Sequence, residues 1–169
     1  MKLVLLASVA FLATPALSQN DDANPMVITA PSRPTVALWS QKITTQINRY
    51  LASPRAFGKY DSTEGTVSVR FSCAEDGKPV SVVLFRSSGD RVIDGAAMRA
   101  IAHLDTLHPM PATIRHDITV QANIIFAVDE SSLARQSKVL RRNEARRIAN
   151  DTDRDRAVVV LEISRRAAG

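Results

Sequence analysis

The chain of 169 residues has little cysteine: Cys73 is the single one, so an internal disulfide bond is excluded. Cys73 ends a segment in which apolar and polar residues alternate, and it falls on the apolar side. This position favours a packed thiol, since a free cysteine behaves as a small apolar side chain. Pairing with a second chain is the alternative that an odd cysteine leaves open.

The sequence also lacks the residue spacings that mark catalytic or metal centres. Neither Ser87 nor Ser88 stands in a Gly-x-Ser-x-Gly elbow, so no serine is marked as an activated nucleophile. The three histidines, His103, His108 and His116, form neither a His-x-x-x-His nor a Glu-x-x-His pair. We therefore expect a protein that is not an enzyme and that holds no metal and no cofactor.

Long apolar runs are missing except near the N-terminus, where residues 3–13 follow Lys2 and precede Pro15. This run is shorter than the roughly 20 residues that a membrane span needs. A charged start, an apolar centre and small residues before Gln19 predict a signal peptide over residues 1–18, cleaved between Ser18 and Gln19. A retained membrane anchor is the alternative. Residues 19–34 are polar and contain three prolines, which predicts a flexible leader.

A helix is predicted over residues 36–51, because apolar residues recur there at three- and four-residue spacing. Thr35, after Pro34, is a plausible N-cap. The single tryptophan, Trp39, lies on the apolar stripe, where packing is its expected role and contact with a peptide is the alternative.

A hairpin followed by a helix is predicted over residues 64–104. Residues 66–73 alternate between polar and apolar, and residues 80–85 are rich in β-branched and apolar side chains. Asp76-Gly77 between them is a turn signal. Asp94 is the expected N-cap of a helix that carries Ile101 on its apolar stripe.

The clearest strand pattern covers residues 118–128. Apolar residues occupy one face, and Thr119, Gln121 and Asn123 occupy the other, which suits a strand edge facing water. Between the predicted helix and this strand, residues 107–115 form a loop that contains Pro109 and Pro111.

These features in this order resemble the C-terminal domain of TonB-type proteins. The resemblance covers residues 39–128 and rests on the Asp-Gly hairpin, on Arg86-Ser87-Ser88-Gly89, on Ile93-Asp94, on the proline loop and on the last strand. The periplasmic domain of TolA has a related pattern. The expected fold for residues 35–130 is α+β: a two-layer sandwich of helix, strand, strand, helix and strand, with a three-stranded antiparallel or mixed sheet. Because a helix joins the second strand to the third, a right-handed connection around the first strand predicts the order 2-1-3.

The resemblance also implies a function. TonB domains capture a short segment of an outer-membrane transporter, which adds to the sheet as an extra strand. We therefore expect a periplasmic protein-binding domain linked to TonB-dependent energy transduction, with an outer-membrane transporter or another envelope protein as its partner. Inner-membrane motor components would act indirectly, nucleic acid is not expected, and a homodimer is left open. The alternative is a TolA-like structural envelope protein without a transporter ligand. The edge expected to bind the peptide is Ile118, Thr119, Val120, Gln121, Ala122, Asn123, Ile124, Ile125 and Phe126.

Residues 131–169 form a distinct basic tail, with 10 basic and 5 acidic side chains against 11 and 12 in residues 19–130. Residues 131–150 predict a basic helix, and residues 157–163 form a short apolar run with strand character. The helix suits an anionic lipid surface or an acidic partner, or it is simply a solvated face. The apolar run either pairs with residues 118–128 and guards that edge, or belongs to a loosely attached tail.

Overall fold

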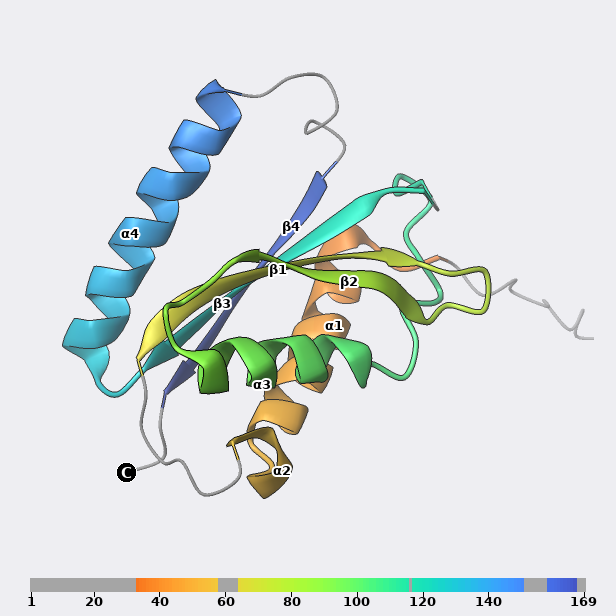
Figure 1. Ribbon diagram of the computed structural model, residues 1–169. Coiled ribbons are helices and arrows are strands. Elements are labelled where there is room, and N and C mark those ends of the chain that lie inside the picture. Colours follow the sequence, from red (N-terminus) through yellow and green to blue (C-terminus); the bar gives the residue numbers. More distant parts are fainter. Residues whose placement is uncertain (1–32, 58–63, 116, 151–157, 167–169) are drawn as a thin grey trace, which may run out of the picture. The chain divides into compact units, whose positions relative to one another are not determined.

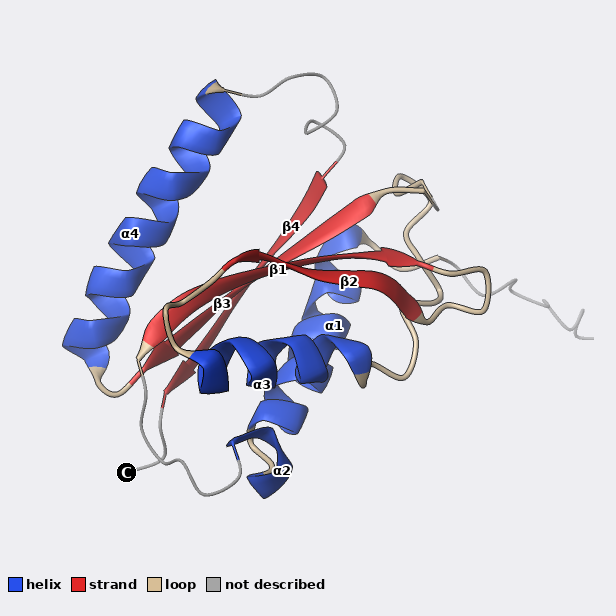
Figure 2. Cartoon of the chain, in the orientation of Figure 1, coloured by secondary structure: helices blue, strands red, loops and turns tan. Residues whose placement is uncertain are grey.

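The computed structural model describes residues 33–57, 64–115, 117–150 and 158–166, and the predictions for residues 1–18 and for most of the leader lie outside them. The described chain is an α+β fold with an open four-stranded mixed sheet, as Figures 1 and 2 show. The elements in chain order are α1 (Val36–Leu51), α2 (Pro54–Phe57), β1 (Gly65–Cys73), β2 (Pro79–Arg86), α3 (Arg91–Ala102), β3 (Thr119–Ala127), α4 (Glu130–Ala149) and β4 (Val158–Arg166).

The sheet has the strand order β2-β1-β3-β4. The predicted order 2-1-3 is therefore confirmed for the first three strands, and β1 pairs antiparallel with both of its neighbours. The tail supplies a fourth strand, since β4 pairs with β3 in parallel. A parallel pair of neighbouring strands needs a crossover connection, and α4 is part of that connection.

Helices α1 and α3 cover one face of the sheet and bury the main core with it. α1 begins where Thr35 accepts a hydrogen bond from the Leu38 amide, and its buried residues are Trp39, Ile43, Ile47 and Leu51. This spacing turns one apolar stripe toward the strands. Trp39 is buried, and its indole nitrogen donates a 2.6 Å hydrogen bond to the Leu107 carbonyl, so packing is its role here.

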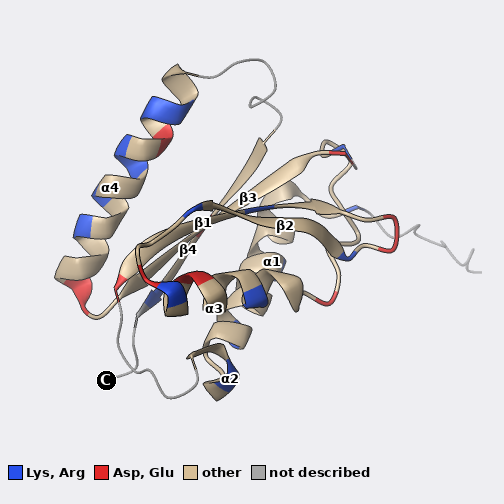
Figure 3. Cartoon of the chain, viewed as in Figure 1, with Lys and Arg blue, Asp and Glu red and all other residues tan. Residues whose placement is uncertain are grey.

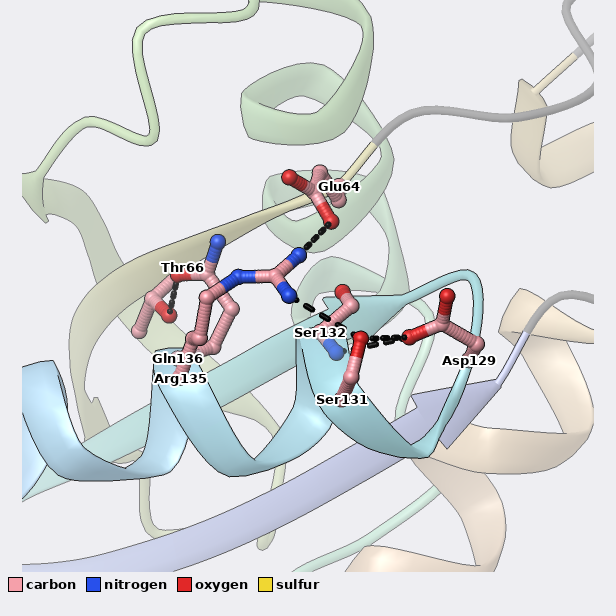
Figure 4. Close-up of polar contacts among 7 residues, drawn as sticks. All are labelled: Glu64, Thr66, Asp129, Ser131, Ser132, Arg135 and Gln136. Atoms are coloured by element: carbon pink, nitrogen blue, oxygen red, sulfur yellow. Dashed lines mark hydrogen bonds and ion pairs between the residues drawn. The ribbon is translucent and has the colours of Figure 1, made fainter.

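Helix α4, which lies beyond the sandwich predicted for residues 35–130, packs against the opposite face of the sheet. A second, smaller apolar cluster joins Leu140 of α4 to Ile125 and Ala127 of β3. Polar contacts join the first turns of α4 to the start of β1, as Figure 4 shows. The Thr66 hydroxyl donates a 3.0 Å hydrogen bond to the Gln136 side chain, and the Arg135 guanidinium lies 3.5 Å from the Glu64 carboxylate. The N-cap Asp129 accepts from the Ser132 amide at 2.7 Å.

The N-cap of α3 differs from the predicted one. Asp90 caps the helix by accepting hydrogen bonds from the amides of Val92 and Ile93, whereas Asp94 lies in the first turn. Its carboxylate instead accepts from the Ser87 hydroxyl at 2.5 Å and from the Ser88 amide and hydroxyl at 2.8 and 2.7 Å. Asp94 therefore ties the end of β2 to α3, because a helix carboxylate one turn inside the cap reaches back to the preceding loop.

The hairpin turn packs against the loop that precedes β3. Gly77 has a φ of +84°, and its carbonyl accepts a 2.7 Å hydrogen bond from the Leu107 amide. A Cβ atom at Gly77 would lie 2.4 Å from the Thr106 hydroxyl oxygen. Glycine is thus required twice here, for the left-handed backbone and for the close approach.

Candidate functional site

The predicted peptide-binding edge lies on β3, which covers the last eight of the nine predicted residues; Ile118 directly precedes the strand. One side of β3 pairs with β1 over seven residue pairs, from Gly65 opposite Phe126 to Phe71 opposite Val120. The other side is the edge where a partner strand was expected. The geometry of that side decides how the site can work.

This edge is occupied in the structure by β4. The pairing runs in parallel from Thr119 opposite Val158 to Ala127 opposite Arg166 and includes the whole of β3. The hypothesis that the apolar run of the tail pairs with this strand is therefore confirmed, and its direction is parallel. Figure 1 shows β4 beside β3, with α4 leading the chain back to the start of the pair.

The strand β4 contributes side chains to the main core as well as backbone hydrogen bonds. Leu161 and Ile163 are buried in the cluster that includes Ala122 and Ile124 of β3. Arg165 places its guanidinium 4.8 Å from the centre of the Phe57 ring. Burial lowers the pKa of Arg165 below its ordinary value. A strand that replaced β4 would have to supply aliphatic side chains at the positions of Leu161 and Ile163.

The polar face of β3 does not face water, in contrast to the prediction. Gln121 and Asn123 are both 0% exposed, because α4 covers them. Gln121 accepts a 3.0 Å hydrogen bond from Arg70 of β1 and donates bonds of 3.0 Å to Asn123 and to Glu144 of α4. Glu144 in turn accepts from Arg147 at 2.8 Å. The alternation of polar and apolar residues predicted that these side chains share one face of the strand, but it did not predict that a helix covers that face.

The outer edge of β2, which the sequence analysis did not single out, has no paired strand in the described part of the chain. Its apolar side chains Val83 and Phe85 are exposed, and the Arg70 guanidinium lies 3.5 Å from the centre of the Phe85 ring. The pairing of β2 with β1 is irregular, and Ser81 has a φ of +53°. Such irregularity is a known protection against strand addition, which makes β2 the poorer docking edge.

The candidate residues for other chemistry are held in structural contacts. Cys73 is half-buried, and burial together with the charge of Asp76 raises the pKa of its thiol. His103 contacts the Arg99 carbonyl at 2.9 Å, and its ring lies against Tyr50. His116 lies outside the described residues. Within the described ranges, no three histidine, cysteine or acidic side chains gather into a group that could hold a metal.

None of the helices in the described part of the chain combines the length and the apolarity that crossing a bilayer requires. Residues 59–128 match the family model described as Gram-negative bacterial TonB protein C-terminal. The matched segment ends directly after β3, so α4 and β4 lie beyond it. No curated protein and no solved structure matches the chain.

Proposed function

Because the domain formed by residues 59–128 belongs to the TonB C-terminal family of periplasmic, non-enzymatic transducer domains, we propose that it binds an extended segment of a TonB-dependent outer-membrane receptor along β3. The family implies an interaction with such receptors and a role in TonB-type energy transduction. The proposal adds the site, which is the edge from Ile118 to Phe126, and the mode of binding, which is strand addition.

The observation that carries this proposal is the parallel pairing of β4 with β3. It supports β3 as an edge that accepts a further strand, because nine residues of the tail already lie there in register. The side chains of β4 also indicate which residues a bound segment would need. A receptor segment in the place of β4 would carry aliphatic side chains where Leu161 and Ile163 now enter the core, and polar ones where Glu162 and Ser164 face outward.

A receptor segment must then compete with β4 for the same edge. The tail belongs to the same chain, and tethered segments compete at effective concentrations on the order of millimolar. A peptide of micromolar intrinsic affinity would therefore bind weakly until β4 leaves. In this proposal β4 guards the edge against unwanted pairing and yields to the receptor.

The test is a titration of synthetic peptides from the periplasmic N-terminal segments of the bacterium's TonB-dependent receptors into two forms of the full chain. The release variant carries Leu161→Asp and Ile163→Asp, which place charges in the core cluster and so free β4. The control carries Glu162→Gln and Ser164→Ala on the exposed face of the same strand. We expect the release variant to bind at least about 10-fold tighter, since a competitor of millimolar effective concentration is removed.

Three results would contradict the proposal. Equal affinity of both variants, with amide exchange showing that β1 to β3 remain folded, would exclude β4 as the competitor. Absence of peptide binding by both folded variants would exclude strand addition at β3. Chemical-shift changes confined to β2 would move the docking site to the opposite edge of the sheet.

A structural role in the envelope, without a transporter ligand, is the second candidate. It is favoured by the burial of Leu161 and Ile163, which makes β4 an integral part of the main core. If β4 never leaves, the edge of β3 stays closed and the domain offers no receptor site there. Amide exchange distinguishes the two, since a permanent β4 would exchange only in global unfolding and a displaceable one through a local opening.

We also propose that the chain is exported and cleaved between Ser18 and Gln19, on the basis of the apolar run and the small residues before Gln19. Mass spectrometry of a periplasmic extract should detect a mature N-terminus at Gln19. Protein that retains Met1 and fractionates with the membrane would instead indicate an anchor, and with it a transducer coupled directly to an inner-membrane motor.

A further inference from the structure

The outward side of α4 carries a stripe of basic side chains. Lys138, Arg142 and Arg146 follow one another at four-residue spacing, and Arg141 lies beside them. All four are exposed, since the opposite side of the helix holds the residues that contact the sheet. Figure 3 shows that Lys and Arg recur along the length of α4.

This charge is not neutralised within the described part of the chain. Lys138, Arg141, Arg142 and Arg146 make no hydrogen bond or ion pair there. Glu144 is the nearest acidic residue in the helix, but it turns toward the sheet and bonds to Gln121 and Arg147. Like charges four residues apart destabilise a helix, so the stripe is unfavourable unless an external anion compensates it.

Two exposed aliphatic side chains flank the basic stripe, one on each side of the helix. Val139 is 47% exposed and Ile148 is 64% exposed. Val139 adjoins the basic stripe on one flank and Ile148 adjoins Arg141 on the other, at helical spacings. Because these two side chains lie half a turn apart around the helix axis, they cannot both contact one flat surface, so the feature that this face offers a partner is its charge.

The spread of the charges favours a surface over a single anion. From Lys138 to Arg146 the stripe runs along about 12 Å of helix, at about 1.5 Å per residue. The side chains diverge from a convex helix and do not converge on one point. Guanidinium groups bind phosphate with two parallel hydrogen bonds, and an array of lipid phosphates offers each arginine its own partner.

We propose that this face of α4, formed by Lys138, Arg141, Arg142 and Arg146, docks on a bilayer that contains anionic phospholipids. The face points away from the sheet, so docking does not obstruct the side of the sheet where β4 pairs with β3. The proposal is therefore independent of the proposed receptor binding. It would hold the domain close to a membrane leaflet.

The test is co-sedimentation of the full chain with vesicles of phosphatidylcholine, either pure or containing about one third phosphatidylglycerol, at low and at physiological salt. The docking variant carries Lys138→Gln, Arg141→Gln, Arg142→Gln and Arg146→Gln. The control variant removes four exposed basic side chains elsewhere, by Arg49→Gln, Arg55→Gln, Lys78→Gln and Arg91→Gln. Both variants have the same net charge, and any contribution of residues 3–13 is common to all three proteins.

We expect the unmodified chain to bind the anionic vesicles and the docking variant to bind them about 600-fold more weakly, since each of the four basic residues near such a surface contributes about 5-fold. The control should stay within about 5-fold of the unmodified chain. If the docking variant melts differently, the pair Arg142→Gln and Arg146→Gln serves instead, with an expected loss of about 20-fold.

Three results would overturn the proposal. Equal binding of the unmodified chain to the two kinds of vesicle would exclude recognition of anionic lipid. Equal loss of binding by both variants would show that the effect depends only on net charge. Tight binding to polyglutamate with no binding to anionic vesicles would identify an acidic polypeptide as the occupant of this face.

Discussion

The side-chain amide of Gln121 in β3 donates a 3.0 Å hydrogen bond to a carboxylate oxygen of Glu144 in α4. The same carboxylate accepts from Arg147 at 2.8 Å, and both members of this ion pair are largely buried. Glu144 thus joins α4 to the sheet at a point where few apolar contacts do so.

Glu144→Ala should lower the free energy of unfolding by about 2 kcal/mol, because it removes the partners of a buried amide and of a buried guanidinium. Glu144→Gln keeps an acceptor and should cost less. Urea denaturation, monitored by the fluorescence of the buried Trp39, measures both changes. Glu75→Ala, at an exposed residue, is the control and should change stability by less than about 0.5 kcal/mol. A loss at Glu144 no larger than at Glu75 would show that α4 is held by its apolar contacts alone.

Asp94 should give the protein a pH-dependent stability. Burial by itself would raise the pKa of this carboxyl, but the hydrogen bonds from Ser87 and Ser88 outweigh it and hold the pKa below its ordinary value. The stabilisation is therefore fully present above the pKa of an unfolded aspartate, about 3.9, and is lost as the pH falls through the lower folded pKa.

Asp94→Asn should accordingly be less stable than the unmodified chain near pH 7, and the difference should shrink in strongly acidic solution. Denaturation curves across this pH range measure the difference. A pH-independent difference for Asp94→Asn would mean that its carboxylate is not the favoured acceptor.

Asp90→Ala, which removes the N-cap of α3, should lower the free energy of unfolding by about 1 kcal/mol.

The two glycines with positive φ should respond differently to alanine. Gly89 has a φ of +91° and no atom within 4 Å of an added Cβ, so Gly89→Ala should cost about 1 kcal/mol from backbone strain alone. Gly77→Ala meets the same strain and also the Thr106 hydroxyl at 2.4 Å. Overpacking adds about 1–3 kcal/mol, so Gly77→Ala should be clearly the less stable in urea denaturation. Equal losses would show that the Thr106 loop moves away without cost.

Cys73 should react slowly with thiol reagents in the folded protein. Burial and the charge of Asp76 raise the pKa of its thiol, so less of the reactive thiolate is present near pH 8. We expect labelling by a maleimide to be at least about 10-fold slower than in urea, where the side chain is accessible. Asp76→Asn should accelerate the reaction modestly. An equal labelling rate in the native protein and in urea would show that the Cys73 thiol is not packed.

The local elements of this protein followed from its sequence. Helix α1 has the predicted bounds 36–51, because Thr35 and the apolar stripe with Trp39 define its start and its buried side. The hairpin of β1 and β2 and the strand β3 followed from alternation and from the Asp76-Gly77 turn. The N-cap of α3 was placed one turn too late, since Asp90 and Asp94 are chemically equivalent candidates and backbone geometry selects between them.

Only the tertiary structure decided what surrounds β3. Sequence reasoning offered two fates for the apolar run of the tail, and the pairing with β3 joins residues far apart in the chain. The environment of Gln121 likewise depends on α4, which crosses the polar face of β3 and removes it from water. Alternation states which side chains share a face of a strand, but burial of that face depends on contacts between distant segments, which no local pattern encodes.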